Sequence, residues 1–296
     1  MNRSGILLVD KSEDFTSQDA VSVVRRIFGL RRVGHAGTLD PMATGLLVVC
    51  LGRATRAVEF LMEGSKEYEA GFKLGISTTT QDTTGEITAR SEKSVTRDEL
   101  LSALKELTGE IYQLPPMYSA LKRGGVPLYR LARQGIEVER ETRRITIERI
   151  DLLEYDESAR RGRIRVACSK GTYIRTLCAD LGGMLGTGGV MSALRRTQSG
   201  EYSVKDAHTL DEIAEIVESA GSDGLLKPVD SVFERYPELH VDAGGERLIK
   251  NGCVVSFTAP DGEYRVYSDS GKFLGISTVH ADTLRVIKSF FETDAG

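Results

Sequence analysis

Segment 34–45 concentrates residues suited to presenting a reacting group. It reads Gly-His-Ala-Gly-Thr-Leu-Asp-Pro-Met-Ala-Thr-Gly. Three glycines and a proline favour unusual backbone angles, and loops of this kind usually hold something in place. The carboxylate of Asp40 precedes Pro41, which favours an extended conformation over a helix cap. Such a carboxylate could act as a nucleophile or as a base, and the alternative is that Asp40 only begins an Asx turn.

Other chemistries fit this loop less well. It lacks the G-x-x-x-x-G-K-[ST] pattern of a phosphate-binding loop, and one histidine, His35, with one aspartate is too small a set for a metal centre. Hydrolysis of a glycosidic bond would need a second carboxylate, and Asp10 and Asp82 lie in no comparable loop. The four cysteines form no C-x-x-C pair, which argues against a zinc site or a disulfide framework and fits a reducing cytoplasm.

A second cluster, 169–175, reads Ser-Lys-Gly-Thr-Tyr-Ile-Arg, where a predicted strand turns through glycine into a helix. Arg175 falls in the first helical turn, where the helix dipole disfavours a cation, so an anionic partner is expected. If that partner is Asp40, the pair would keep the carboxylate ionised and oriented. The alternative is an exposed arginine on a solvated helix face.

Segment 114–144 interleaves tyrosines with basic side chains. Guanidinium groups can meet phosphates and aromatic rings can meet unstacked bases, so this composition suits folded or single-stranded RNA. A long solvated excursion is the alternative, although excursions of this length are usually functional. The formal net charge of −4 argues against a nucleic-acid partner, but 119–175 carries a basic excess and 206–242 an acidic one. The net charge therefore does not exclude a polyanionic partner.

The elements around these clusters follow from apolar spacing. Strands are predicted at 6–9, 46–51, 68–74, 145–147 and 164–168, with helices after Ser17 and Ile174 and after the capping boxes Thr96/Glu99 and Thr209/Glu212. Strands and helices alternate without regular βαβ spacing, which predicts an α+β fold with a mixed, mainly antiparallel central sheet flanked by helices. After about residue 232 only short strands are predicted, as in a small β-barrel-like domain. The longest apolar run, 46–51, is too short to span a membrane.

Together these segments resemble the TruB family of tRNA pseudouridine synthases, which isomerise uridine 55 in the T-loop. The resemblance covers residues 5–202 in the family's order. The matching residues are Lys11 with Thr16-Ser17, the loop 34–45, Lys66-x-Tyr68, Leu74-Gly75, the run 115–122, Pro127-Leu128-Tyr129, the block 169–175, and Leu194-Arg195-Arg196 with Gly200. The Gly-His-x-Gly-x-Leu-Asp-Pro motif is the most specific of them.

The resemblance implies roles for individual residues. Asp40 is the catalytic aspartate, Tyr68 the aromatic residue against the target base, and Arg175 the ion-pair partner of Asp40. The resemblance also implies substrate contacts for five residues. They are the loop histidine His35, the first-motif lysine Lys11, Leu194 against the flipped uracil, and Lys122 and Tyr173 in the matching blocks.

The resemblance also implies the organisation of the whole chain. A catalytic domain would span 1–232, with an insertion at about 118–144 that clasps the T-loop, and a PUA-like RNA-binding domain would span 233–296. No cofactor and no metal are expected, the partner is tRNA, and a monomer in the cytoplasm is predicted. The alternative is an RNA-binding or RNA-folding protein without chemistry, which would account for the arginines but leave the Asp40 loop without a role.

Two departures from the family pattern stand out. The family shows Lys-Pro-x-Gly after the first strand, where this chain has Lys11-Ser12-Glu13-Asp14. The geometry of that turn therefore cannot be carried over. The C-terminal match is diffuse and rests on the neighbourhood of 248–257.

Overall fold

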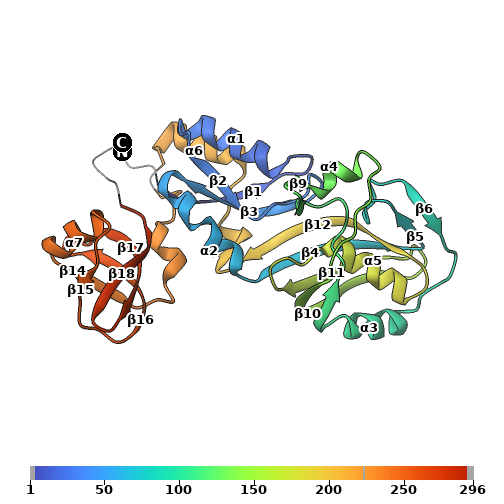
Figure 1. The fold of residues 1–296 in the computed structure, drawn as a ribbon. Helices are drawn as coiled ribbons and strands as arrows, with labels where there is room; N and C mark the ends of the chain where they lie inside the picture. The colour runs from blue at the N-terminus through green and yellow to red at the C-terminus, as the bar shows by residue number, and fades with distance from the viewer. Residues whose placement is uncertain (1–3, 223, 292–296) are drawn as a thin grey trace.

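The computed structural model describes residues 4–222 and 224–291. Within them the largest unit is a nine-stranded sheet (Figure 1), built from β1 (Gly5–Lys11), β2 (Val33–Ala36), β3 (Thr44–Leu51), β4 (Lys66–Leu74), β7 (Gly109–Gln113), β10 (Arg143–Asp156), β11 (Arg161–Cys168), β12 (Gly189–Ser199) and β13 (Tyr202–Ser203). Its strand order is β1-β3-β12-β4-β11-β10-β7, with β2 on β3 and β13 on β12. β3 and β12 pair in parallel and the neighbouring pairs run antiparallel, which confirms the predicted mixed, mainly antiparallel sheet.

Helices cover the sheet unevenly (Figure 1). They are α1 (Ser17–Phe28), α2 (Val58–Glu63), α3 (Arg97–Glu106), α4 (Leu128–Ala132), α5 (Ile174–Met184), α6 (Leu210–Ala220) and α7 (Ala243–Lys250), with the 3-10 helices η1 (Gly52–Ala57), η2 (Val204–Asp206) and η3 (Val229–Phe233). The side chains of β1 and β3 alternate between two cores, so both faces are buried there. This double burial explains why both strands are almost continuously apolar.

The start of α1 differs by one residue from the prediction. The N-cap is Thr16, whose side chain accepts a hydrogen bond from the backbone of Asp19 in a capping box. Ser17 is instead the first helical residue and lies buried. The helix ends as predicted at Gly29, which adopts a φ of 62°. Ser17 is thereby free to bond outside its own helix.

The two predicted capping boxes both begin helices. Thr96 and Glu99 cap α3, and Thr209 and Glu212 cap α6. Both boxes are made reciprocally, with each side chain bonded to the other residue's backbone. These helix starts follow from local sequence alone.

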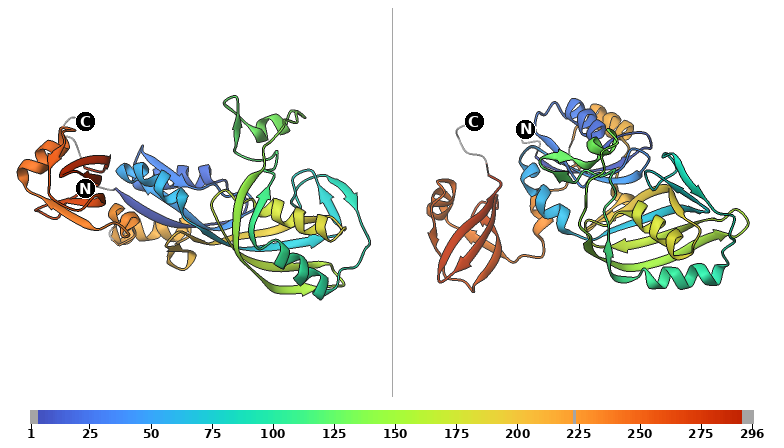
Figure 2. Two further views of the ribbon diagram at one scale, coloured as in Figure 1. Left: turned by 60° about the horizontal axis from the view of Figure 1, so that its bottom comes forward. Right: turned by 45° about the vertical axis from the view of Figure 1, so that its right-hand side comes forward.

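Between β7 and β10 the chain leaves the sheet and projects from it, as Figure 2 shows. This excursion contains the two-residue strands β8 (Lys122–Arg123) and β9 (Val126–Pro127), followed by α4. A second hairpin, β5 (Ile76–Thr78) with β6 (Ile87–Arg90), follows β4. The predicted excursion of 114–144 is thus a distinct substructure carried by two strands of the sheet.

The C-terminal part contains a separate sheet, five-stranded within the described residues. It consists of β14 (Glu238–Val241), β15 (Val255–Ser256), β16 (Gly262–Ser268), β17 (Phe273–His280) and β18 (Thr283–Ser289), in the order β14-β16-β17-β18-β15. The sheet forms a half-barrel, in agreement with the predicted β-barrel-like appendage. The expectation that this part contains only strands is wrong, because Asp242 caps the eight-residue helix α7. The helix buries Ile249 against this sheet's core, and a helix of eight residues depends on such tertiary packing for its stability.

The half-barrel contacts the main sheet through aromatic residues. Phe233 is 1% exposed and its ring packs against Phe60 of α2 and against Phe273 and Phe290, with centroids 5.0, 6.1 and 5.5 Å away. This cluster is continuous with the core on one face of β1 and β3. None of the helices in 4–222 and 224–291 has the length and hydropathy needed to cross a membrane.

Candidate active site

The catalytic-loop candidate joins β2 to β3, which pair antiparallel. Its centre is tied to α1, because the Ser17 hydroxyl accepts from the backbone N–H of Leu39 at 2.8 Å and donates to the Leu39 carbonyl at 3.2 Å. The Ala43 N–H donates to the Asp40 carbonyl at 3.0 Å and closes a turn. Asp40 is therefore presented by a backbone anchored on both sides.

Glycine is required where this loop enters β3. Gly45 has a φ of 95°, and a Cβ there would lie 2.3 Å from the carbonyl oxygen of Arg196 on β12. A larger residue would push β12 away from β3 at the place where the two strands pair in parallel. The glycine thus permits the close approach of β12, which carries further candidate residues.

Asp40 forms the predicted ion pair with Arg175. The Arg175 Nε lies 2.9 Å from Oδ2, and Nη2 donates to Oδ1 at 3.3 Å. The arginine side chain is 7% exposed, against 35% for the aspartate. The alternative of a solvated first-turn arginine is therefore wrong, and the two-pronged contact fixes the direction in which the carboxylate points.

Arg175 is itself held from three further sides. Its guanidinium donates to the carbonyl of Thr80 at 3.1 Å and to that of Tyr118 at 2.7 Å, and it lies 3.7 Å from Asp82 Oδ2. The Tyr118 contact ties the root of the projecting excursion to the ion pair. Arg175 thus connects the catalytic loop, the excursion and the turn after β5.

Asp82 is the residue that sequence reasoning set aside. It is 5% exposed, and its Oδ1 accepts from the hydroxyls of Thr80 and Thr84 at 2.7 and 2.6 Å. Burial of a carboxylate among hydroxyls beside an arginine marks it as part of this site. The run of threonines around it was the available signal, although spacing alone could not show that it meets Arg175.

The groups around Asp40 have opposing effects on the pKa of its carboxyl. Burial raises the pKa of the Asp40 carboxyl above its ordinary value, the Arg175 guanidinium lowers it, and the Asp82 carboxylate raises it again. The Lys11 ammonium adds a smaller lowering effect, and the balance leaves the pKa of Asp40 raised. A raised pKa makes the carboxylate a better base and nucleophile than an exposed one.

Tyr68 and Leu194 lie on one face of adjoining strands. Tyr68 of β4 pairs with Arg196 of β12, and Leu194 pairs with Ala70, so the four residues share a face. Leu194 is 8% exposed. Burial raises the pKa of the Tyr68 phenol above its ordinary value, and the neighbouring Arg196 opposes that rise.

Lys11 holds the Asp40 loop through hydrogen bonds from its buried ammonium group. It is fully buried, and its ammonium donates to the carbonyls of Phe15 at 2.6 Å and Pro41 at 3.2 Å. Burial lowers the pKa of Lys11 to about 8. The unusual turn after it contains Asp14 with a φ of 59°, in the position where the family pattern has glycine. Aspartate tolerates this left-handed conformation, so the turn keeps the geometry that glycine would allow.

The remaining predicted residues divide into two groups. Tyr173 is the N-cap residue of α5, two residues before Arg175 in the chain, and Gln113 accepts from its backbone N–H at 2.8 Å and donates to its carbonyl at 3.1 Å. Lys122 is exposed on β8 and His35 lies on β2, and neither contacts the ion pair. In the described part of the chain no group of three His, Cys, Asp or Glu residues could hold a metal ion.

Comparison with known proteins places the chain in a family. The family model described as "TruB family pseudouridylate synthase (N terminal domain)" matches residues 25–174, and "tRNA pseudouridylate synthase B C-terminal domain" matches 175–234. "tRNA pseudouridine synthase B" of Stutzerimonas stutzeri is 43% identical over 286 residues, covering 94% of this chain and 92% of the relative. The protein of the same name from Aromatoleum aromaticum is 46% identical, covering 92% and 87%.

Solved structures agree on the fold. The chain is similar to one in the crystal structure of a Cbf5-Nop10-Gar1 complex, with a TM-score of 0.73, 25% identity and coverage of 97% of this chain and 85% of that one. It is similar in fold to a chain of an H/ACA RNP bound to a substrate RNA, with a TM-score of 0.72, 23% identity and coverage of 98% and 86%. With both family models and close relatives spanning nearly its full length, the chain belongs to the TruB family of pseudouridylate synthases.

Proposed function

We propose that the chain isomerises uridine 55 in the T-loop of tRNA to pseudouridine, with Asp40 as the catalytic carboxylate. The observation that carries the proposal is the ion pair of Asp40 with Arg175 on a loop anchored by Ser17 and Lys11. The named relatives are tRNA pseudouridine synthases, which supports a uridine of tRNA as the substrate.

One carboxylate is enough for this reaction. Isomerisation breaks the bond between N1 and C1′ and joins C5 to C1′, and the proton on C5 is finally lost while N1 gains one. The nucleoside therefore keeps its composition, and no redox partner is needed. Ionised Asp40 attacks C1′ or removes a proton from the sugar, and Arg175 keeps it charged and directed in either case.

The uridine must leave its stack to reach Asp40, at a cost of a few kcal/mol. Tyr68 and Leu194, which share a sheet face beside the loop, would enclose the uracil and keep water from the opened sugar. We assign to Tyr173 a contact with the same nucleotide, to His35 a part in keeping it everted, and to Lys122 a contact with the RNA backbone from the excursion.

We further propose that residues 1–232 form the catalytic domain and 233–296 a PUA-like RNA-binding domain. The start of the separate C-terminal sheet at β14 supports this division. The excursion at 118–144 would clasp the T-loop, because it projects from the sheet and its root contacts Arg175 through Tyr118. The enzyme is expected to act as a monomer in the cytoplasm.

The test is conversion of uridine in an unmodified tRNA transcript, read by carbodiimide labelling with primer extension and by tritium release from 5-tritiated uridine. The wild-type chain should modify position 55, and Asp40→Asn should lose at least about a thousandfold in rate, since the reacting group is gone. Binding of tRNA by Asp40→Asn should stay within about threefold of wild type.

Three results would contradict the proposal. Normal turnover by Asp40→Asn would remove that residue from its role. A free base in the products would indicate hydrolysis instead of isomerisation. Tight binding of tRNA by the wild-type chain without any conversion would favour the RNA-binding alternative.

A further inference from the structure

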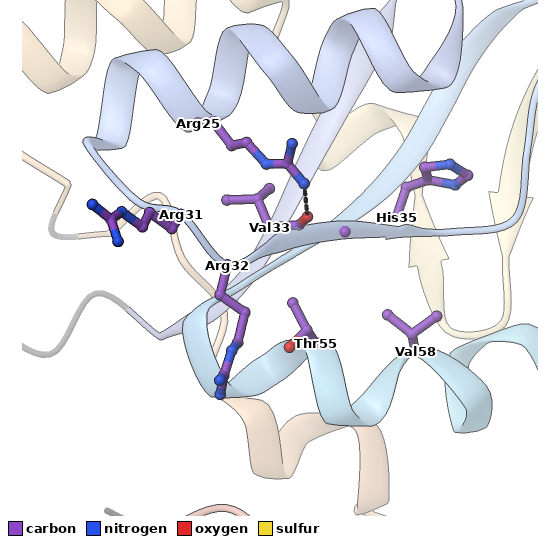
Figure 3. Close-up of a pocket in the computed structure, with 8 residues that line it drawn as sticks. Arg25, Arg31, Arg32, Val33, His35, Thr55 and Val58 are labelled. Atoms are coloured by element: carbon purple, nitrogen blue, oxygen red, sulfur yellow. Dashed lines mark hydrogen bonds between the residues drawn. The ribbon is translucent and has the colours of Figure 1, made fainter. Parts of the chain in front are cut away.

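A second candidate site lies outside the Asp40 ion pair. It is an open pocket of about 550 Å³ beside strand β2 (Figure 3). Three arginines from the end of α1 and the loop after it line the pocket. The other lining residues come from β2, η1 and α2. The full set is Arg25, Arg31, Arg32, Val33, Gly34, His35, Thr55 and Val58. The volume is within the range of pockets that hold small-molecule ligands, and no residue of the Asp40–Arg175 pair contributes to it.

The charge of this pocket is not balanced by the protein. No acidic residue lines it. Within the described residues, the side chains of Arg31 and Arg32 make no hydrogen bond or ion pair, and both residues are exposed. The third arginine, Arg25, donates to the backbone carbonyl of Val33 at 3.0 Å. The pocket therefore carries a net positive charge.

The arginines on the open face of the main sheet are different. Arg163 and Arg165 both pair with Glu69, at 2.9 and 2.8 Å, and Arg149 lies 3.0 Å from Glu67. That surface is neutralised by its own carboxylates. An external anion should therefore prefer the pocket, where the cations lack internal partners.

The pocket walls are already in place. Arg25 is fixed to β2, and the Thr55 hydroxyl donates to the Gly52 carbonyl at 2.8 Å. The helix η1 is tied from its other side to the end of β18, because Arg56 donates to the carbonyl of Ser289 at 2.9 Å. The Arg32 carbonyl accepts from the Gly52 N–H at 2.8 Å, so the backbone at the pocket is fixed, whereas the exposed side chains of Arg31 and Arg32 lose freedom when an anion binds.

We propose that this pocket binds the phosphodiester backbone of the RNA substrate, with Arg31 and Arg32 each contacting one phosphate. The inference rests on the proposed function and adds to it a backbone contact separate from the target nucleotide. The guanidinium groups of Arg31 and Arg32 point in different directions (Figure 3), so each can meet a different phosphate of a nucleic-acid strand.

The pocket is close enough to the active site for one RNA strand to contact both. β2 leads directly from Val33 into the loop of Asp40, and seven residues of fully extended chain span at most about 25 Å. His35 lines the pocket, and its buried Nδ1 has no hydrogen-bond partner in the described residues. Burial and the nearby Arg196 lower the pKa of His35, so the anion is attracted by the arginines and not by an imidazolium.

The first test measures RNA binding by an Arg31→Gln/Arg32→Gln double variant in the Asp40→Asn background. A full tRNA transcript is titrated between 50 and 300 mM KCl. We expect about tenfold weaker binding at low salt, and a slope of log K against log salt that is shallower by about 1.4–1.8, as loss of two phosphate contacts predicts. The control is Arg149→Gln/Arg163→Gln, which removes the same charge from the neutralised sheet face and should leave affinity and slope nearly unchanged.

The second test locates the contacted phosphates. Transcripts ethylated at random phosphates are separated into bound and free fractions, and positions at which ethylation prevents binding are mapped. A position within a few nucleotides of the target uridine should interfere with the Asp40→Asn protein and not with the variant that also lacks Arg31 and Arg32. An identical interference pattern and salt slope in both proteins overturns the inference. Failure of the wild-type chain to form pseudouridine would instead contradict the proposed function.

Discussion

At the scale of single residues, one guanidinium organises the candidate site. Arg175 occupies a first helical turn, where the helix dipole disfavours a cation, yet its side chain is almost fully buried. Two carboxylates, Asp40 and Asp82, and two backbone carbonyls offset that cost. Asp40 is the more exposed of the two carboxylates, so it is the one that a substrate can reach.

The raised pKa of Asp40 leads to a prediction about pH dependence. The reaction needs the ionised carboxylate, so activity is present above this pKa and is lost as the pH falls through it. Because burial raises the pKa, the acid limb of kcat/KM should lie above the ordinary carboxyl value near 4. Single-turnover rates measured between pH 4 and 9 give the position of this limb, and a limb at or below 4 would contradict the assignment.

The neighbouring charges should move that limb in opposite directions. Asp82→Asn removes a charge that raises the pKa of Asp40 and should move the limb to lower pH. Arg175→Gln removes the cation that lowers this pKa, so the limb of its residual activity should move to higher pH. Shifts of the same sign in both variants would mean that the limb reports another group.

At the scale of elements, the first turn of α1 performs two tasks with adjacent residues. Thr16 caps the helix, and the hydroxyl of Ser17 bonds both backbone groups of Leu39 in the catalytic loop. A helix start thereby positions Asp40, which follows Leu39 directly. The stability of the helix and the geometry of the loop can be separated by mutation at these two positions.

We expect Thr16→Ala to cost about 1 kcal/mol of stability through the lost cap, with kcat almost unchanged. Ser17→Ala leaves the buried backbone groups of Leu39 without partners, which should cost about 1–3 kcal/mol and also lower kcat, because Asp40 is less firmly held. Urea unfolding and single-turnover kinetics measure the two effects. A similar loss of kcat in both variants would show that the loop depends only on the helix and not on this hydrogen bond.

At the scale of the whole molecule, the half-barrel and the main sheet are joined by a small aromatic core. Phe233 is its centre. Two hydrogen bonds from η1 add to the junction, one from Arg56 to Ser289 at the end of β18 and one from Arg53 to Phe291 beyond that strand. This junction sets the separation between the Asp40 site and the C-terminal sheet. An RNA that contacts both would depend on it.

We expect Phe233→Ala to destabilise the docked half-barrel by about 3–5 kcal/mol through the cavity that it leaves. Hydrogen exchange in β16–β18 should accelerate, and KM for full tRNA should rise more than KM for a T-arm hairpin, which offers less RNA for the C-terminal sheet to contact. Leu248→Ala, at an exposed position on α7, is the control and should change neither value. Equal effects on both RNAs would mean that the junction only stabilises the catalytic part.

The sequence alone predicted the helices and strands that are specified by residues close together in the chain. Capping boxes, apolar spacing and Gly29 predicted α1, α3 and α6, and the apolar runs predicted β1 and β3. The resemblance to a family also pointed to Asp40 and Arg175, which the ion pair brings together. Capping and periodicity act within a few residues, so one sequence is enough to read them.

Tertiary structure alone decided which distant residues share a site. Asp82 and the Tyr118 carbonyl meet Arg175 across separations of about 90 and 60 residues. Arg31 lines the same pocket as Thr55 and Val58 only because β2 packs beside η1 and α2. Such contacts depend on sheet order and on how closely strands approach, as Gly45 permits for β12. No periodicity along the chain encodes them, because the energy of a long-range contact depends on the packing of the elements that carry its residues.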